Sequence, residues 1–400
     1  MRNIWISLIS KFMMSLHWFA PVLLLYYQDI IGLSISDFFF VQAIFTLFVF
    51  VLEIPTGFIA DRFSRKLSVV LGGLSGLVGL WFLHIAYSLN MVILAEFFLA
   101  LNLALNSGAF ESLYYESLVR ANKLKQYPIY LGWLKNLHLG GLLVSVLSGS
   151  FLAVYFGLEN IFLITFLTAI VPTIMYFFLD DVSVTSKGNL KANRGSEVSR
   201  NLQVFKDLWS VLHSKKEVLF LALDSAVIPA VAFMSIWLYQ PFLIGYEVSI
   251  LLFGFLHAGL VLAQMLVNYL VKHITWDLAK YLKYSQLSMF AGFLVLALVP
   301  NVIVSSLALM LIAGVGLTRS TYLNKEIQLH LEDSYRATFF SGVGMLNMLV
   351  RTALTFAIGY IIVWSQYFVA FVLALLILAL YFLFQRQEQI ITNLSKKKLL

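Results

Sequence analysis

The 400-residue sequence contains no cysteine. The chain therefore has no disulfide bond, no thiolate nucleophile and no metal held by cysteine. Histidine is also scarce, and the seven His residues show neither the HExxH nor the HxxxH spacing of a helical zinc site. The phosphate-binding pattern GxxxxGK followed by Ser or Thr is missing, so ATP hydrolysis by this chain is unsupported. We accordingly expect no metal, no cofactor and no enzyme activity.

Charged residues are few, and apolar residues fill the chain instead. Asp, Glu, Lys and Arg make up 12% of the sequence, against about 25% in soluble globular proteins, and 61% is hydrophobic. The mean hydropathy is +0.89. A water-soluble fold could not bury so much apolar surface, so lipid is the expected solvent. Basic cytoplasmic loops explain the net charge of +7 better than nucleic acid does, and we expect no nucleic-acid partner.

Twelve stretches are long and apolar enough to cross a membrane as helices. The N-terminus resembles a signal peptide but lacks a small-x-small cleavage site, so we interpret it as a retained first span. The longest polar interruption, Asp180 to Lys216, separates two sets of six. The expected spans are 4–28, 37–60, 67–88, 91–117, 127–155, 159–179, 217–243, 248–272, 279–299, 301–326, 335–362 and 366–385.

This pattern predicts an all-α integral membrane protein with two pseudo-symmetric six-helix bundles. The N-terminal bundle is expected at 1–180 and the C-terminal bundle at 217–386, followed by a cytoplasmic tail at 387–400. The loop at 181–216 includes an amphipathic segment, Asn201–Leu212. We expect that segment to lie as a helix on the inner membrane surface, with a regulatory docking helix as the alternative.

The distribution of positive charge predicts the orientation. With the N-terminus inside, the predicted outside loops hold no Lys or Arg, and they carry Asp29, Glu159 and Glu247 instead. Cytoplasmic loops of membrane proteins are enriched in Lys and Arg. Both termini are therefore expected in the cytoplasm, and the protein in the inner or plasma membrane of a cell.

A charged motif follows the second expected span. The segment Gly57-Phe58-Ile59-Ala60-Asp61-Arg62-Phe63-Ser64-Arg65-Lys66 fits the pattern G-x-x-x-D-R-x-x-R-R/K. A glycine there lets a neighbouring helix approach closely. An acid at a helix end is stabilised by the positive end of another helix dipole. The defining positions are Gly57, Asp61, Arg62, Arg65 and Lys66.

This motif, its place after the second span and the six-plus-six division resemble the major facilitator superfamily. The resemblance implies secondary active transport of a small molecule by alternating access. It also implies that the motif loop latches the two halves while the cytoplasmic side is closed, with an acceptor near Arg336-Ala337-Thr338. The alternative is that these charges only enforce topology.

Finer features resemble small bacterial efflux-type members of that superfamily. They are Glu53-Ile54-Pro55-Thr56, Ser107 to Leu118 and Tyr239-Gln240-Pro241-Phe242. The fifth span lacks the Gly-Pro signature of drug–proton antiporters, and the arginine usual within the fourth span is missing. The resemblance favours proton-coupled efflux of an amphipathic compound by an antiporter, acting as a monomer. Uptake of a nutrient or metal-chelator complex is one alternative, and a non-transporting sensor or scaffold is another.

Ionisable residues at membrane depth are the candidate cavity and coupling residues, because a charge costs roughly 2.5–3.5 kcal/mol at the centre of a spanning helix. Glu96 and Glu111 lie about 60° apart on a continuous fourth helix and would form one polar face. An alignment of the two halves places Glu111 opposite Arg319, either as a gate that opens or as a static pair. The candidates are Glu53, Glu96, Glu111, Lys135, Asp224, Arg319 and Arg351.

Proton coupling requires a carboxyl group whose pKa changes with its surroundings. Glu111, Glu96 and Asp224 qualify by position. Other polar and small residues have simpler roles, and we expect Gly72, Gly76 and Gly79 to share the packing face of the third span.

Overall fold

The computed structural model describes the backbone of residues 1–181, 216–271, 273–274, 276–330 and 333–397, and every regular element within these ranges is helical. The amphipathic segment Asn201–Leu212 lies outside the described residues. Eleven of the described helices are long and apolar enough to cross a membrane. This confirms the all-helical membrane fold. The spans are α3 (Ile35–Arg62), α4 (Arg65–His84), α5 and α6 (Leu89–Asn106, Ala109–Arg120), α7 (Tyr127–Phe156), α8 (Ile161–Phe177), α10 (Lys216–Gly245), α11 (Ile250–Val271), α12 (Leu278–Leu298), α13 (Val302–His330), α14 (Asp333–Ile361) and α15 (Gln366–Lys397).

Several helices begin where a polar side chain satisfies free backbone N–H groups. Ser34 begins α3 with a capping box, in which its hydroxyl accepts from the Asp37 N–H and Asp37 accepts from the Ser34 N–H. Ser64 caps α4 by accepting from Leu67 N, and Asp277 caps α12 by accepting from Lys280 N. These caps fix the starts of three spans within a few residues of the positions expected from hydropathy.

The expected first span is interrupted rather than continuous. Helix α1 (Arg2–Met14) stops before a non-helical stretch at 15–19. The chain then continues as short helical pieces that end in a π-helical turn, Tyr26–Ile30. No described helix in this region is long enough to cross a membrane by itself. For this reason eleven helices meet the length and hydropathy of a span, and the expected first span does not.

The expected fourth span is broken as well. Helix α5 ends at Asn106 and α6 begins at Ala109. Between them Gly108 has a positive φ of 68°, a left-handed conformation that glycine adopts without steric cost. The fourth span is therefore not one straight helix, and the predicted single polar face from Glu96 to Glu111 is wrong.

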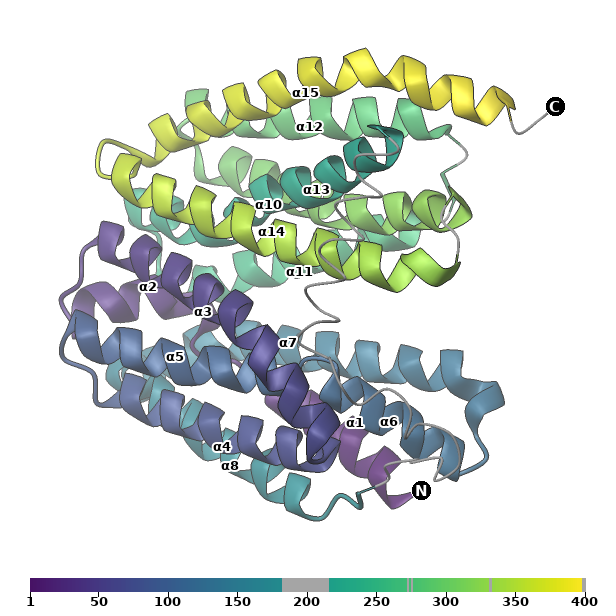
Figure 1. Ribbon diagram of the computed structural model, residues 1–400. Helices are drawn as coiled ribbons and strands as arrows, with labels where there is room; N and C mark the ends of the chain where they lie inside the picture. The colour runs from purple at the N-terminus through teal and green to yellow at the C-terminus, as the bar shows by residue number, and fades with distance from the viewer. Residues whose placement is uncertain (182–215, 272, 275, 331–332, 398–400) are drawn as a thin grey trace. The chain divides into compact units, whose positions relative to one another are not determined.

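The chain forms two compact units. Of the described residues, the first unit comprises those within 1–181 and 249–255, and the second those within 216–248 and 256–397. In the N-terminal unit α4 packs against both α5 and α8 (Figure 1). A methyl group at Gly76 would lie 2.6 Å from the Asn102 amide nitrogen, and one at Gly79 would lie 2.8 Å from Leu99. The expected packing role of this glycine face is therefore confirmed.

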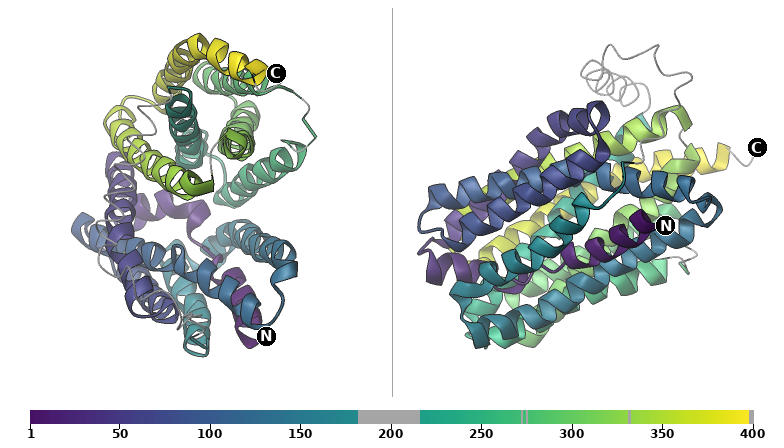
Figure 2. Two further views of the ribbon diagram at one scale, coloured as in Figure 1. Left: turned by 45° about the vertical axis from the view of Figure 1, so that its right-hand side comes forward. Right: turned by 90° about the horizontal axis from the view of Figure 1, so that it is seen from below.

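The C-terminal unit packs its helices side by side as a bundle (Figure 2). Helix α10 contacts α13, α14 and α15, and α12 contacts α13 and α15. The aromatic rings of Phe220 and Phe384 join α10 to α15 edge to face, with centroids 4.8 Å apart. This arrangement places α10, α12 and α13 around one buried polar group, described next.

Candidate functional site

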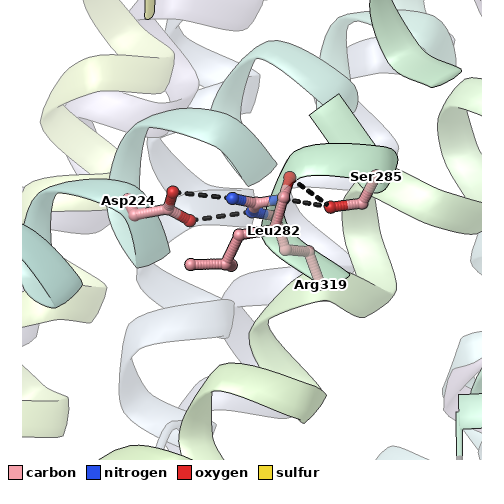
Figure 3. Close-up of polar contacts among 4 residues, drawn as sticks. All are labelled: Asp224, Leu282, Ser285 and Arg319. Atoms are coloured by element: carbon pink, nitrogen blue, oxygen red, sulfur yellow. Dashed lines mark hydrogen bonds and ion pairs between the residues drawn. The ribbon is translucent and has the colours of Figure 1, made fainter. Parts of the chain in front are cut away.

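Arg319 and Asp224 form a buried ion pair in the C-terminal unit (Figure 3). Arg319 Nε and Nη2 each donate to one carboxylate oxygen of Asp224, at 2.7 Å in both cases. Arg319 Nη1 donates to the Leu282 carbonyl at 2.8 Å and to the Ser285 hydroxyl. Both charged residues are fully buried. The bidentate geometry matches the planar guanidinium to the carboxylate and ties α10, α12 and α13 together.

This pairing corrects the sequence-based partner of Arg319. Pseudo-symmetry suggested Glu111, but the guanidinium is committed to Asp224 within its own unit. Asp224 was a candidate proton carrier, and here its carboxylate is held by a cation on both oxygens. In this structure both charges are engaged with each other inside the C-terminal bundle, and a coupling role for either residue stays a prediction.

Arg351 on α14 also has its charge engaged. Its guanidinium carbon lies 3.4 Å from the centre of the Phe233 ring on α10, an arrangement that is electrostatically favourable. Asn347, one turn earlier on α14, donates to the Ala226 carbonyl at 2.7 Å. Arg351 Nε has no hydrogen-bond partner among the described atoms. Arg351 therefore contributes to the α10–α14 contact through its ring stacking.

Glu96 is a buried acid with a different environment. The Tyr27 hydroxyl, in the π-helical turn of the first span, donates to Glu96 Oε1 at 2.7 Å. Within the described part of the chain, no ion pair is formed by Glu96. Glu96 thus differs from Asp224. Neutralising Asp224 would leave Arg319 as an unpaired buried cation, whereas neutralising Glu96 would leave no cation unpaired.

Glu111 lies in the first turn of α6, directly after the break in the fourth span, and its side chain is exposed. An acid in the first turn is favoured by the positive end of the helix dipole. Beside the break, the Ser107 hydroxyl donates to Glu53 Oε1 at 3.2 Å. Two acids, Glu53 on α3 and Glu111 on α6, thus flank the point where the helix is interrupted.

Basic and polar residues gather at the other broken helix. Ser15 ends α1, and its hydroxyl lies 2.6 Å from His138 Nδ1 on α7. Lys11 and His138 are near enough to His17 for their charges to interact with it, and Lys11 is similarly close to Glu111. Lys11 Nζ also lies 5.5 Å from the centre of the Phe110 ring. We name Lys11, Ser15, His17, Glu111 and His138 the N-terminal polar cluster.

The members of this cluster differ in exposure. The side chains of His17 and Glu111 are exposed, Lys11 and His138 are half-buried, and Ser15 is buried. Lys135, an expected cavity residue, is exposed on α7 three residues before His138. Residues three apart on a helix are surface neighbours, so Lys135 adjoins the cluster. Charged side chains at membrane depth are therefore exposed on this face of the N-terminal unit.

Small residues of α7 accommodate the interruption of the first span. A methyl group at Gly141 would lie 2.5 Å from the Phe12 carbonyl oxygen, and one at Gly149 would collide with the Trp18 carbonyl oxygen. Ser145 donates to the Ser15 carbonyl at 3.4 Å, and Trp18 Nε1 donates to Thr168 at 3.1 Å. Non-helical backbone at membrane depth is tolerated where protein covers it or where it lines a polar site, and α7 supplies that cover.

A family model described as Major Facilitator Superfamily matches residues 5–351. The chain belongs to this superfamily. No curated protein sequence matches the chain. The crystal structure of the nucleoside transporter NupG is similar, with a TM-score of 0.76 at 14% identity over 96% of this chain and 99% of that one.

Two further solved structures share the facilitator fold. The POT family transporter PepTSo has a TM-score of 0.72 at 13% identity, covering 97% of this chain and 98% of its own. A bacterial homologue of the human lysosomal transporter Spinster, inward-facing and unoccupied, has a TM-score of 0.68 at 17% identity, covering 89% and 81%. Identities this low establish the fold alone.

Within the facilitator fold, the motif loop joins α3 to α4. Arg65 forms an ion pair with Glu116 on α6, inside the N-terminal unit. Gly57 is exposed, and nothing lies within 4 Å of a methyl group placed there. Lys66 is half-buried. The side chains of Asp61 and Arg62, and of Arg336 to Thr338, lie outside the described residues, so the latch stays a prediction.

Three structural features around the candidate residues were not predicted from the sequence. Tyr27 gave no signal, because a tyrosine in an apolar run is indistinguishable from packing. Glu116 lies near the end of α6, and an acid facing a basic loop could have suggested a partner for Arg65. The Ser107-Gly108 pair is a recognised site of helix interruption, and it was the available signal for the break.

Proposed function

We propose that this facilitator is a secondary transporter that moves a small amphipathic molecule by alternating access, coupled to protons. The observation that carries this proposal is the N-terminal polar cluster with Lys135. Ionisable side chains are rare at membrane depth and mark substrate or ion pathways when they are not used for structure. Asp224, Arg319 and Arg351 are engaged in helix packing, whereas the side chains of Glu111, Lys135 and His17 are exposed.

Aromatic rings beside these charges support an amphipathic substrate. The Phe110 ring centre lies 5.5 Å from Lys11 Nζ, and Phe19 lies 5.8 Å from His17 between ring centres. A molecule with an apolar body and polar groups would find partners for both. Small-molecule sites commonly combine an apolar lining with a few polar groups that fix orientation.

Export is the direction we propose first, on the resemblance of segments such as Glu53–Thr56 to efflux-type facilitators. Uptake of a nutrient or a metal-chelator complex is the second candidate; NupG and PepTSo, which share the fold, are described as a nucleoside transporter and a POT family transporter, and neither description gives a direction. Alternating access is reversible, so gradients decide the direction in both cases.

Ligand screening followed by transport in liposomes tests the proposal. Compounds that raise the melting temperature of the purified protein are carried forward, since a native-state ligand stabilises by RT ln(1 + [L]/Kd). In proteoliposomes, an imposed pH gradient should drive accumulation of such a compound. Glu111→Gln should weaken the response to the gradient, and Asp29→Asn, an exposed acid outside the cluster, should not. Ligand binding without any flux would favour the sensor or scaffold instead.

A further inference from the structure

The basic and the acidic side chains of this part of the N-terminal unit come from different helices, and Lys11 lies close to Glu111 where the two sets adjoin. The two lysines, Lys11 and Lys135, lie on α1 and α7, and the imidazoles of His17 and His138 lie beside them on the non-helical stretch and on α7. The acids lie on α3 and α6, with Glu53 hydrogen-bonded to Ser107 and Glu111 in the first turn of α6. Both sides border an interruption in a spanning helix.

The two interruptions differ in what they present to a ligand. At the first, Gly141 and Gly149 of α7 lie close to the carbonyl oxygens of Phe12 and Trp18, while His17 remains exposed. At the second, Ser107 and Gly108 are themselves exposed, and nothing lies within 4 Å of a methyl group placed at Gly108. The first interruption therefore presents side-chain donors to a ligand. The second presents carboxylates next to solvent-exposed backbone at Ser107 and Gly108.

We propose that this face is a binding site for a zwitterionic substrate, with its acidic group against Lys11, His17 and Lys135 and its basic group against Glu111 and Glu53. This rests on the proposed transport function and names its substrate class. A cationic substrate would be repelled by Lys11 and Lys135, and an anionic one by Glu53 and Glu111. A molecule that carries both charges can pair with the lysines and with the acids. A ligand with only one charge would leave the opposite set of side chains desolvated without a partner, which is energetically unfavourable.

The absence of cysteine makes a direct test possible, because any introduced thiol is the single reactive one. His17→Cys reports the basic side, and Ser107→Cys reports the acidic side. Each purified variant is treated with an anionic and a cationic methanethiosulfonate reagent, and the rate of thiol modification is measured for each. Each rate is divided by the rate at which the same reagent modifies a free thiol in solution. Coulomb interactions bias the local concentration of each reagent by the sign of the nearby charge.

The expected result is opposite preference at the two positions. His17→Cys should favour the anionic reagent and Ser107→Cys the cationic one, so that the normalised ratios differ by about tenfold. Adding Lys11→Gln should reduce the preference at His17→Cys by about threefold and leave Ser107→Cys less affected. Adding Glu111→Gln should act in the reverse sense. High salt should diminish all of these differences.

A second reporter guards against a variant that does not fold. Asn136→Cys lies on α7 beside Lys135, is exposed, and should show the same anionic preference as His17→Cys. Equal preference at the acidic and basic positions, or no effect of Lys11→Gln and Glu111→Gln, would overturn the proposal. Labelling is measured without transport, so a protein that shows the charge separation but moves no solute would refute the transport function alone.

Discussion

Asp224 and Arg319 combine two opposite charges with almost no access to solvent, at 1% and 0% of their side-chain surfaces. Removing one partner of such a pair leaves an unpaired buried charge and costs about 3–5 kcal/mol. Replacing both with apolar residues of similar size is often neutral. We predict that Asp224→Leu and Arg319→Met each lower the thermal stability of the purified protein strongly, and that the double variant recovers most of the loss.

The exposed pair of Arg2 and Asp180 provides the matched control. Its side chains are 61% and 51% exposed, and such pairs contribute about 0–1 kcal/mol. Arg2→Gln should therefore barely change the melting temperature. Additive losses in the Asp224 and Arg319 double variant would show that the two residues do not act as a pair.

Tyr27 is the donor to the buried carboxyl group of Glu96. Tyr27→Phe keeps the ring and leaves Glu96 without this hydrogen bond, which should cost about 1–3 kcal/mol. We expect a lower melting temperature for Tyr27→Phe, and a smaller effect when Glu96→Met, which removes the acceptor, is already present, because the two residues share one interaction. Tyr155→Phe, at a residue 79% exposed, is the control. Equal losses in the two backgrounds would contradict a direct link.

At the scale of elements, the contact between α1 and α7 depends on one glycine and not on its neighbour. A methyl group at Gly141 would meet the Phe12 carbonyl at 2.5 Å, whereas one at Gly140 meets nothing within 4 Å. Gly141→Ala should destabilise the protein by about 1–3 kcal/mol through overpacking. Gly140→Ala should be neutral or stabilising, because alanine favours helix over glycine by about 1 kcal/mol. Thermal unfolding of this adjacent pair checks the packing.

Hydropathy located the spans well, and local interruptions were what it missed. A stretch such as 4–28 stays apolar whether its backbone is one helix or several pieces, so a window average cannot detect the stop at Ser15. The same holds at Gly108, whose left-handed backbone follows from its place in the fold. The packing face of Gly72, Gly76 and Gly79 was predictable, because the spacing of residues along one helix determines which of them share a face.

The pairing of charges was less predictable than their depth. Sequence position indicated that Asp224, Arg319 and Glu96 lie within the membrane, but partners depend on which helices are neighbours in space. Pseudo-symmetry linked Arg319 to the other half of the chain, whereas α10 and α13 lie together in the same unit. The Arg65–Glu116 pair shows the same preference for contacts inside one bundle.

At the scale of the whole molecule, orientation follows from the positive charges. We predict that reporter fusions after Lys66, Lys125, Lys191 and Lys398 report the cytoplasm, because basic loops stay inside. Fusions after Gly32, Asn90 and Asn301 should report the outside. Alkaline phosphatase and green fluorescent protein give opposite signals and serve as mutual controls. A reversal at one of the first three cytoplasmic positions would refute the assignment of twelve crossings.

The Asp224–Arg319 pair also has a consequence for the order in which the protein is made. The residues are 95 positions apart, so at about 5–20 residues per second the ribosome produces Asp224 roughly 5–20 s before its partner. During that interval α10 carries an uncompensated acid, which opposes its entry into lipid by roughly 2.5–3.5 kcal/mol. Stable insertion of α10 should therefore wait for α13, and chains truncated before Arg319 should leave α10 extractable from the membrane.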